Sequence, residues 1–266
     1  MSVKNAIHQK FMAIVTPYLK APHKSTLNKN GKITPEEFVI AGDSLVAVCP
    51  NWSWAPSPDP KKAVDYLPAD KQFLINRHVV CQDRAQDFLK LVDKEENVPE
   101  FDDWYQTGEA AKEEVVDLDD EEVIDLDDIN IDEIEPEEIE NKDAPVCRTY
   151  DITICYDNYY NTAHVYLYGV NPQGVQLTLE EMYQDISADH VEKTVTFENH
   201  PYFNQKTLSI HPCQHHNVIL KLIERLENPE SFCAPAFFFL FLKFIHTVIP
   251  TIDISTPQIE IGENRT

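Results

Sequence analysis

An acidic tract in the middle of the chain limits the folds that this sequence can adopt. Between Asp93 and Asp143 there are 24 acidic residues and only 3 lysines. Carboxylates at this density repel one another, so the tract cannot collapse into a core of its own, and we expect it to be flexible in isolation. Any folded domain must therefore be assembled from the segments before and after it.

The charge outside this tract is nearly balanced. The chain of 266 residues has a net charge of -24, but outside the tract 22 acidic residues accompany 19 lysines and arginines. A nucleic-acid-binding protein needs clustered lysines and arginines to neutralise phosphates, so the charge distribution argues against that class. Hydrophobic residues make up 42% of the chain, which is sufficient for a sizeable core.

Helical periodicity occurs near both ends of the chain. Apolar residues between Val3 and Lys20 recur at the spacing of an amphipathic helix. This helix either packs on the core or lies at a membrane surface, and its apolar face carries Ile7, Phe11, Ile14, Val15 and Tyr18. Residues 217–226 predict a half-buried helix. Residues 234–250 predict a buried helix or strand, because they fall short of the ~20 apolar residues that span a bilayer.

Another helix is predicted to begin after Thr34. Thr34 is a suitable N-cap, Pro35 suits the first helical position, and Glu37 completes a capping box. The segment around Gly31 resembles half of a calcium-binding loop, but Thr26 occupies the position where an anionic ligand is required. We therefore expect a turn there and no calcium.

The remaining pattern is that of short strands. Residues 71–80, 149–156, 164–170 and 191–197 predict strands, whereas the prolines within residues 50–60 predict a rigid loop. Strands in series followed by helices, on both sides of the acidic tract, indicate an α+β domain interrupted by a long insertion.

The candidate reactive group is Cys213, one of six cysteines. The chain has no C-x-x-C pair and no signal-peptide pattern at Met1, so we expect free thiols in a reducing compartment. Cys213 follows a short strand and precedes a helix, whose N–H groups favour a nucleophilic thiolate near neutral pH, as do nearby protonated histidines.

Three other interpretations of this segment remain open. Cys213 can be a buried structural thiol, the histidines can be surface residues, or a zinc ion can be bound by His211, Cys213, His215 and His216. The zinc interpretation lacks the second, distant pair of ligands that structural zinc sites usually have.

Several stretches on both sides of the acidic tract form an ordered set, at residues 34–43, 66–68, 71–74, 156–160, 182–187, 193–201, 211–213, 241–244 and 249–252. In sequence and in order they resemble the autophagy-related protein 3 family of ubiquitin-conjugating-like enzymes. The resemblance implies an α+β fold with a ubiquitin-conjugating-enzyme-like antiparallel sheet flanked by helices. It divides the chain into an N-terminal helix (1–20), a first domain part (21–92), an acidic flexible insertion (93–148) and a second domain part (149–266).

The same resemblance implies an activity for the His-Pro-Cys motif. Cys213 would receive a ubiquitin-like modifier from an activating enzyme as a thioester and transfer it to phosphatidylethanolamine, without cofactor or metal. Thr194 or Thr196 would stabilise the oxyanion, and both fit a strand face toward Cys213. His211 is a possible base or orienting group. The alternative is a catalytically silent adaptor that binds the activating enzyme.

The resemblance also implies partners. The insertion would bind the activating enzyme, with Val123, Ile124, Leu126 and Ile129 as candidate contacts, and the N-terminal helix would sense curved membranes. The conjugate would act within a ligase-like complex. We therefore expect a cytoplasmic protein that is transiently peripheral on the forming autophagosome membrane.

Overall fold

The computed structural model describes residues 19–85, 147–191, 193–252 and 254. All of them belong to one compact unit of the chain. The predicted N-terminal helix, apart from its last residues, and nearly all of the acidic insertion lie outside the described residues. The fold below therefore concerns the body formed by the two flanking parts.

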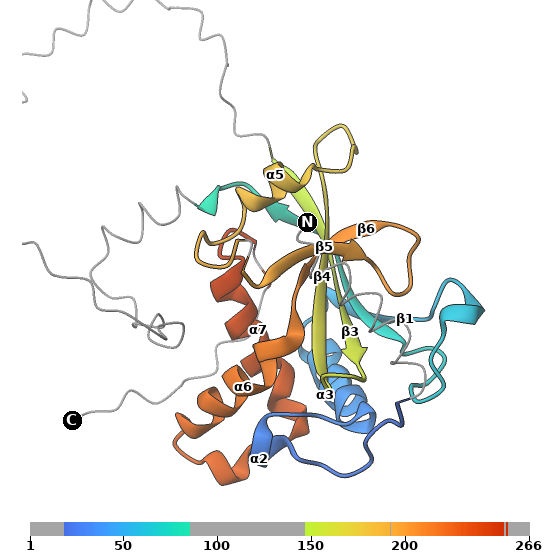
Figure 1. The fold of residues 1–266 in the computed structure, drawn as a ribbon, viewed down its shortest axis with the longest axis vertical. Helices are drawn as coiled ribbons and strands as arrows, with labels where there is room; N and C mark the ends of the chain where they lie inside the picture. Colours follow the sequence, from blue (N-terminus) through green and yellow to red (C-terminus); the bar gives the residue numbers. More distant parts are fainter. Residues whose placement is uncertain (1–18, 86–146, 192, 253, 255–266) are drawn as a thin grey trace, which may run out of the picture. The chain divides into compact units, whose positions relative to one another are not determined.

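An antiparallel sheet of six strands organises this body (Figure 1). The strands lie in the order β1-β2-β3-β4-β6-β5. Their bounds are β1 Trp52–Ala55, β2 Phe73–Cys81, β3 Arg148–Asp157, β4 Thr162–Val170, β5 Val195–Asn199 and β6 Lys206–Ile210. Because β2 precedes the insertion and β3 follows it, their pairing unites both parts of the chain in one sheet and, with the flanking helices, confirms the α+β fold.

One strand was not predicted. The proline-rich segment was expected to be a loop, but Trp52–Ala55 pairs with Phe73–Asn76 as the edge strand β1. Pairing with this distant segment stabilises the strand, so the local sequence pattern alone does not predict it. The other predicted strands are present with shifted ends, and the one predicted from residue 191 begins only at Val195.

Helices complete the body, and the helices predicted after Thr34 and at residues 217–226 are confirmed, while residues 234–250 are helical for most of their length. Thr34 caps α3 through a capping box with Glu37, at 3.1 and 2.8 Å. The helices are α2 Leu27–Asn30, α3 Pro35–Val48, α5 Leu179–Tyr183, α6 His215–Glu224 and α7 Phe237–Val248. Single 3-10 turns occur at η2 Pro60–Lys62, η6 Pro212–Gln214, η7 Pro229–Ser231 and η8 Ala234–Ala236. Among the helices described, none is long and apolar enough to cross a bilayer.

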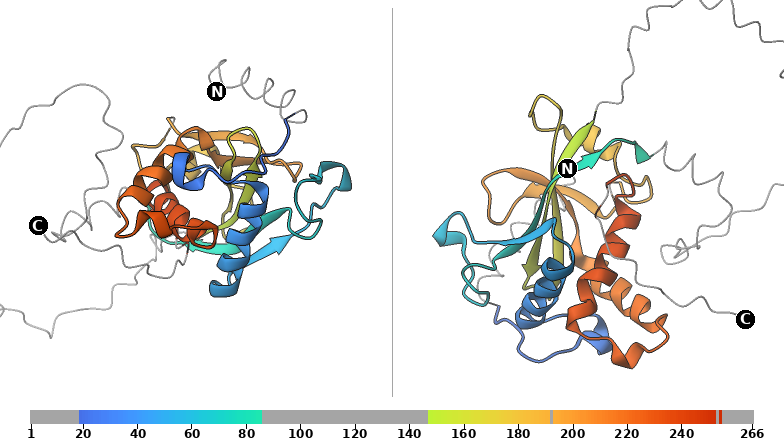
Figure 2. Two further views of the ribbon diagram at one scale, coloured as in Figure 1. Left: turned by 90° about the horizontal axis from the view of Figure 1, so that it is seen from below. Right: turned by 180° about the vertical axis from the view of Figure 1, so that it is seen from behind.

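The main core lies between the sheet and the helices (Figures 1 and 2). Phe38 of α3 packs edge-on against Tyr156 of β3 and Phe238 of α7, with ring centroids 5.6 and 5.5 Å apart. Side chains alternate along a strand, so Ile152 and Ile154 share this face with Tyr156. Burying each large apolar side chain contributes about 1.5–3 kcal/mol.

The opposite face of the sheet carries a smaller core that contains polar groups. Phe73, Ile75, Cys155 and Tyr166 are covered there by Tyr202, from the segment between β5 and β6. The buried His200 holds this cover: its Nδ1 accepts from the N–H of Tyr202, and its Nε2 lies 2.7 Å from the hydroxyl of Thr153.

A buried carboxylate joins the two sides of the insertion. Asp185, only 1% exposed, accepts hydrogen bonds from Arg84 and Arg148 at 2.8 and 3.0 Å. Arg84 follows β2 and Arg148 begins β3, while Tyr150 also donates to Asp185. The points where the chain leaves and re-enters the sheet are therefore fixed to one side chain.

Candidate active site

Cys213 lies in η6, the turn between the end of β6 and the start of α6. Pro212 fixes the first backbone angle of the turn. The N–H of Cys213 donates to Nδ1 of His211 at 3.3 Å, so the histidine side chain caps the turn. Cys213 is partly exposed, and its sulfur is therefore in a position that a macromolecular partner can reach.

The acidity of the Cys213 thiol differs from the prediction. Burial raises its pKa, and hydrogen bonds from the backbone N–H groups of Cys213 and Gln214 offset this only in part. The predicted amide groups are present, but they do not produce a thiolate near neutral pH. A thiol of high pKa is a poor leaving group, so an acyl group bonded to it exchanges slowly with other thiols.

Thr194 and Thr196 do not share a strand, contrary to the prediction. Thr194 is the last residue of a turn, because β5 begins at Val195. The carbonyl of Thr194 accepts from the N–H of His211 at 2.7 Å, whereas Thr196 pairs with Ser209. His211 directly precedes the nucleophile turn, and Ser209 lies two residues before His211. Thr194, which pairs with His211, is therefore two strand positions, roughly 7 Å, nearer to that turn than Thr196.

The hydroxyls of these threonines also differ. Thr194 Oγ1 lies 3.1 Å from Nδ1 of His190. Thr196 Oγ1 is buried and finds no hydrogen-bond partner among the residues that the structure describes. Thr194 is therefore the better placed of the two candidates, and its hydroxyl has a hydrogen-bond partner.

Tyr160 belongs to the site, although reasoning from residue types alone did not single it out. It lies in the turn between β3 and β4, and its ring meets that of His211 edge-on, with centroids 5.4 Å apart. Burial and then the charge of Cys213 raise the pKa of the phenol, which therefore stays protonated. His211 accordingly contacts both the backbone of Cys213 and the ring of Tyr160.

A buried charged cluster lies behind this turn, and no local sequence pattern indicated it. His164 of β4 has its Nδ1 3.4 Å from Asp157 Oδ2 and its Nε2 3.5 Å from Glu198 Oε1. Nε2 is also 2.5 Å from the hydroxyl of Ser209. Burial alone would lower the pKa of His164, but the two carboxylates raise it to about 9, so the imidazole is a cation.

The pKa values of Glu198 and Asp157 are shifted in the opposite direction to that of His164. Burial would raise the pKa of Glu198, but hydrogen bonding and charge from His164 lower it to about 2. The pKa of Asp157 is lowered too, since His164 and the N–H groups of Tyr160 and Tyr159 outweigh its burial. The cluster thus holds one cation between two anions.

His215, another histidine of the motif, has structural partners, whereas the buried Nδ1 of His216 finds no hydrogen-bond partner among the described residues. His215 is buried, its Nδ1 lies 2.9 Å from the carbonyl of Ala163, and its ring packs edge-on against Phe241 and Phe244. Burial lowers the pKa of His215 to about 3. In the described part of the chain, no group of three or more His, Cys, Asp or Glu side chains is arranged to hold a metal. The zinc interpretation therefore finds no support.

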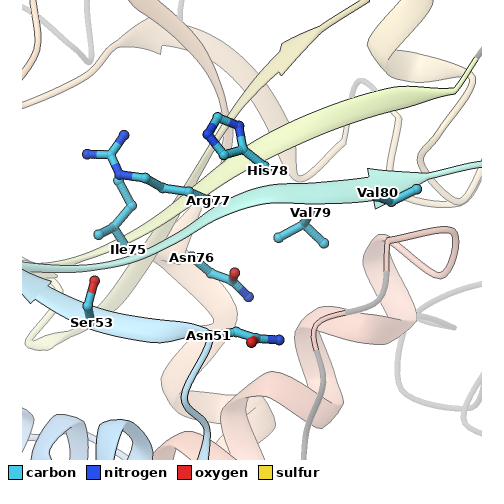
Figure 3. A pocket seen from close by; sticks show the side chains of 8 residues that line it. All are labelled: Asn51, Ser53, Ile75, Asn76, Arg77, His78, Val79 and Val80. Atoms are coloured by element: carbon cyan, nitrogen blue, oxygen red, sulfur yellow. The ribbon is translucent and has the colours of Figure 1, made fainter. Parts of the chain in front are cut away.

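A hollow of about 550 Å³ lies elsewhere, at the edge of the sheet (Figure 3). It is bordered by Asn51 and Ser53 on one side and by residues 75–80 of β2 on the other. There β2 continues beyond its pairing with β1, and His78 adopts a positive φ of 56°. None of the candidate catalytic residues borders it.

Sequence comparison relates this geometry to known proteins. The family described as "Autophagocytosis associated protein, active-site domain" matches residues 37–256, which include Cys213. Autophagy-related protein 3 of Arabidopsis thaliana is 33% identical, with 100% of both chains covered. The protein of that name from Candida glabrata is 42% identical over 77% of this chain and 71% of its own length, and that from Pichia angusta 37% over 76% and 71%. The chain therefore belongs to the autophagy-related protein 3 family, a family of conjugating enzymes of autophagy.

Proposed function

We propose that this chain carries a ubiquitin-like modifier as a thioester on Cys213 and transfers it to the amine of phosphatidylethanolamine. The observation that carries the proposal is the partly exposed Cys213 in a turn capped by His211, with Thr194 bonded to the same histidine backbone. Family membership supports the same chemistry.

In the first step, Cys213 Sγ attacks the carbonyl of the thioester that joins the modifier to the activating enzyme. A new C–S bond forms, the old C–S bond breaks, and the proton of the thiol ends on the departing thiolate. Burial raises the pKa of Cys213, so its sulfur is a poor leaving group toward other thiols and retains the acyl group once it is bound.

In the second step, the lipid amine attacks the same carbonyl. The C–N bond forms, the C–S bond breaks, and one amine proton ends on the sulfur of Cys213. Negative charge develops on the carbonyl oxygen, and the hydroxyl of Thr194 is the candidate donor to it. His211 orients the turn, since its Nδ1 already accepts from the Cys213 N–H.

Replacement of Cys213 tests the assignment. With activating enzyme, modifier and ATP, wild type should form an adduct that a thiol reagent cleaves, whereas Cys213→Ser should form an oxyester that resists it. Cys233→Ser is the matched control, because Cys233 is exposed and lies outside the motif. If the activating enzyme becomes charged but neither wild type nor Cys213→Ser accepts the modifier, the catalytically silent adaptor is the correct function.

Two further parts of the proposal concern residues outside the described body. The insertion, through Val123, Ile124, Leu126 and Ile129, is proposed to dock the activating enzyme. Deletion of residues 117–140 should therefore abolish charging of Cys213 while the circular dichroism spectrum stays native. Unchanged charging after this deletion would contradict the assignment.

The N-terminal helix is proposed to bind membrane, so Phe11→Asp should reduce lipidation on small liposomes and leave charging of Cys213 intact. Equal loss of lipidation and charging would contradict a membrane-binding role.

A cytoplasmic location is part of the proposal. A helix that binds lipid only through one apolar face gives reversible attachment. The protein is therefore proposed to associate peripherally and transiently with the forming autophagosome membrane, and its conjugate to work within a ligase-like complex. Fractionation of cells should find most of it in the soluble fraction.

A further inference from the structure

We propose that His164 is a positioning residue for Cys213: clamped between Asp157 and Glu198, it fixes the turn that carries Tyr160 and thereby the histidine that caps the nucleophile. This inference rests on the proposed thioester function. It extends that function to a side chain that does not touch the reacting atoms.

His164 is held rigidly by its surroundings. Its side chain is nearly fully buried and stacks on Tyr166, with ring centroids 4.2 Å apart and planes 28° from parallel. Both ring nitrogens have partners: Nδ1 faces Asp157 and lies 3.0 Å from the Tyr166 hydroxyl, and Nε2 faces Glu198 and the Ser209 hydroxyl. The two carboxylates and the two hydroxyls therefore hold the ring in one orientation.

Asp157 connects His164 to the turn. One oxygen of Asp157 faces the imidazole, and the other accepts from the N–H groups of Tyr159 and Tyr160, each at 2.9 Å. The carboxylate thus couples the position of the cation to the backbone of the turn. Without the cation, a buried anion would have to move or be protonated, and the turn would lose its fixed acceptor.

Tyr160 and His211 connect the turn to the sulfur-bearing residue. The ring of Tyr160 rests edge-on against His211, whose Nδ1 accepts from the Cys213 N–H. A second route exists along β6, because Ser209 contacts His164 and lies two residues before His211. Both routes end at the same cap, so displacement of His164 reaches the nucleophile turn from two sides.

A purely structural role is the alternative, and the body offers a matched control for it. Arg148 and Asp185 form an equally buried pair at the other end of β3, far along the strand from Cys213. Arg148→Gln removes the cation of the pair with Asp185, just as His164→Gln removes the cation between Asp157 and Glu198. His164→Arg is the rescue variant, because a planar guanidinium keeps the charge, can bridge two carboxylates and can stack on Tyr166.

The experiment uses the full chain at a temperature where circular dichroism finds each variant folded. Preformed thioester is mixed with phosphatidylethanolamine vesicles, and its discharge is followed in a single turnover. We expect His164→Gln to slow discharge roughly tenfold, since small misplacements of a reacting group are costly. His164→Arg should recover most of the rate, and Arg148→Gln should keep the wild-type rate despite its lower stability.

A second readout separates this inference from the proposed function. The rate at which iodoacetamide alkylates Cys213 is compared with that of the exposed Cys233 in the same molecule, by mass spectrometry. Absence of a thioester in wild type would refute the proposed function, and the ratio of the two alkylation rates would still decide on His164. If His164→Gln cannot be obtained folded, Tyr160→Leu breaks the route downstream and should slow discharge similarly.

The inference is overturned by any of three results. His164→Gln discharges at the wild-type rate with an unchanged alkylation ratio, Arg148→Gln is slowed as strongly as His164→Gln, or His164→Arg restores neither readout. A slowed Gln variant, a restored Arg variant and an unaffected Arg148 variant together support it.

Discussion

The two ends of β3 bury similar ion pairs but have different neighbours. At the start of the strand, Arg148 and Arg84 enclose Asp185, beside the places where the insertion begins and ends. At its end, Asp157 faces His164 and holds the turn whose Tyr160 contacts His211, the cap of Cys213. Similar buried ion pairs can thus join two parts of the chain at one end of a strand and position the reacting residue at the other end.

The largest expected effect is on stability at the first end. Asp185→Asn leaves the buried Arg148 and the half-buried Arg84 without their counter-charge and should lower the free energy of unfolding by about 3–5 kcal/mol. Urea denaturation followed by circular dichroism measures this. Asp43→Asn, which removes the carboxylate of the more exposed pair with Lys71, should cost at most about 1 kcal/mol. The comparison fails if Asp185→Asn also slows discharge of the folded protein.

The next effect concerns catalysis at the second end. Thr194→Val should slow thioester discharge by about 10²-fold, the usual result of removing one oxyanion donor. Thr196→Val should change discharge little and should not destabilise the protein, because the buried hydroxyl that it removes has no partner in the described body. A larger loss for Thr196→Val would reverse the assignment made from the ladder.

The smallest expected effect separates the two ends by pH. His164 has a folded pKa of about 9 against 6.5 when unfolded, so its stabilisation is complete below pH 6.5 and is lost as the pH rises through about 9. The stability difference between wild type and His164→Gln should therefore shrink by on the order of 1–3 kcal/mol over that range.

The control for this titration is Arg148→Gln. Guanidinium groups do not titrate in that range, so the stability difference for this variant should stay constant. Denaturant midpoints are compared only above pH 6.5, because His200 and His215, whose pKa values burial lowers to about 3, destabilise the fold on the acid side. A constant difference for His164→Gln would mean that its imidazole is not a cation in the folded protein.

The features that were predictable from sequence are local ones. The capping box of Thr34 and Glu37 involves neighbours in the chain, and it forms as expected. The turn at Gly31, where φ is 68°, is likewise a matter of one residue. Cys213 was found because His-Pro-Cys marks a strand followed by a helix.

The features that were missed depend on distant partners. β1 was interpreted as a loop because its pairing partner begins at Phe73. Asp157, His164 and Glu198 each have the appearance of polar residues on half-exposed strands, and only the sheet order, which places β4 beside β6 and β6 beside β5, brings them together. The acidity of Cys213 also depends on burial that no sequence pattern records.

The attachment of Arg84 and Arg148 to one carboxylate has a consequence for chain connectivity. Arg84 and Arg148, which flank the insertion, are both held by Asp185, and β2 is paired to β3, so the two ends of the insertion are already close together. Doubling the length of such a loop costs only about 0.6 kcal/mol. Relatives can therefore lengthen or rewrite this insertion at little thermodynamic cost. Fragments 1–85 and 147–266, made without the segment between them, should therefore still reassemble around the shared sheet.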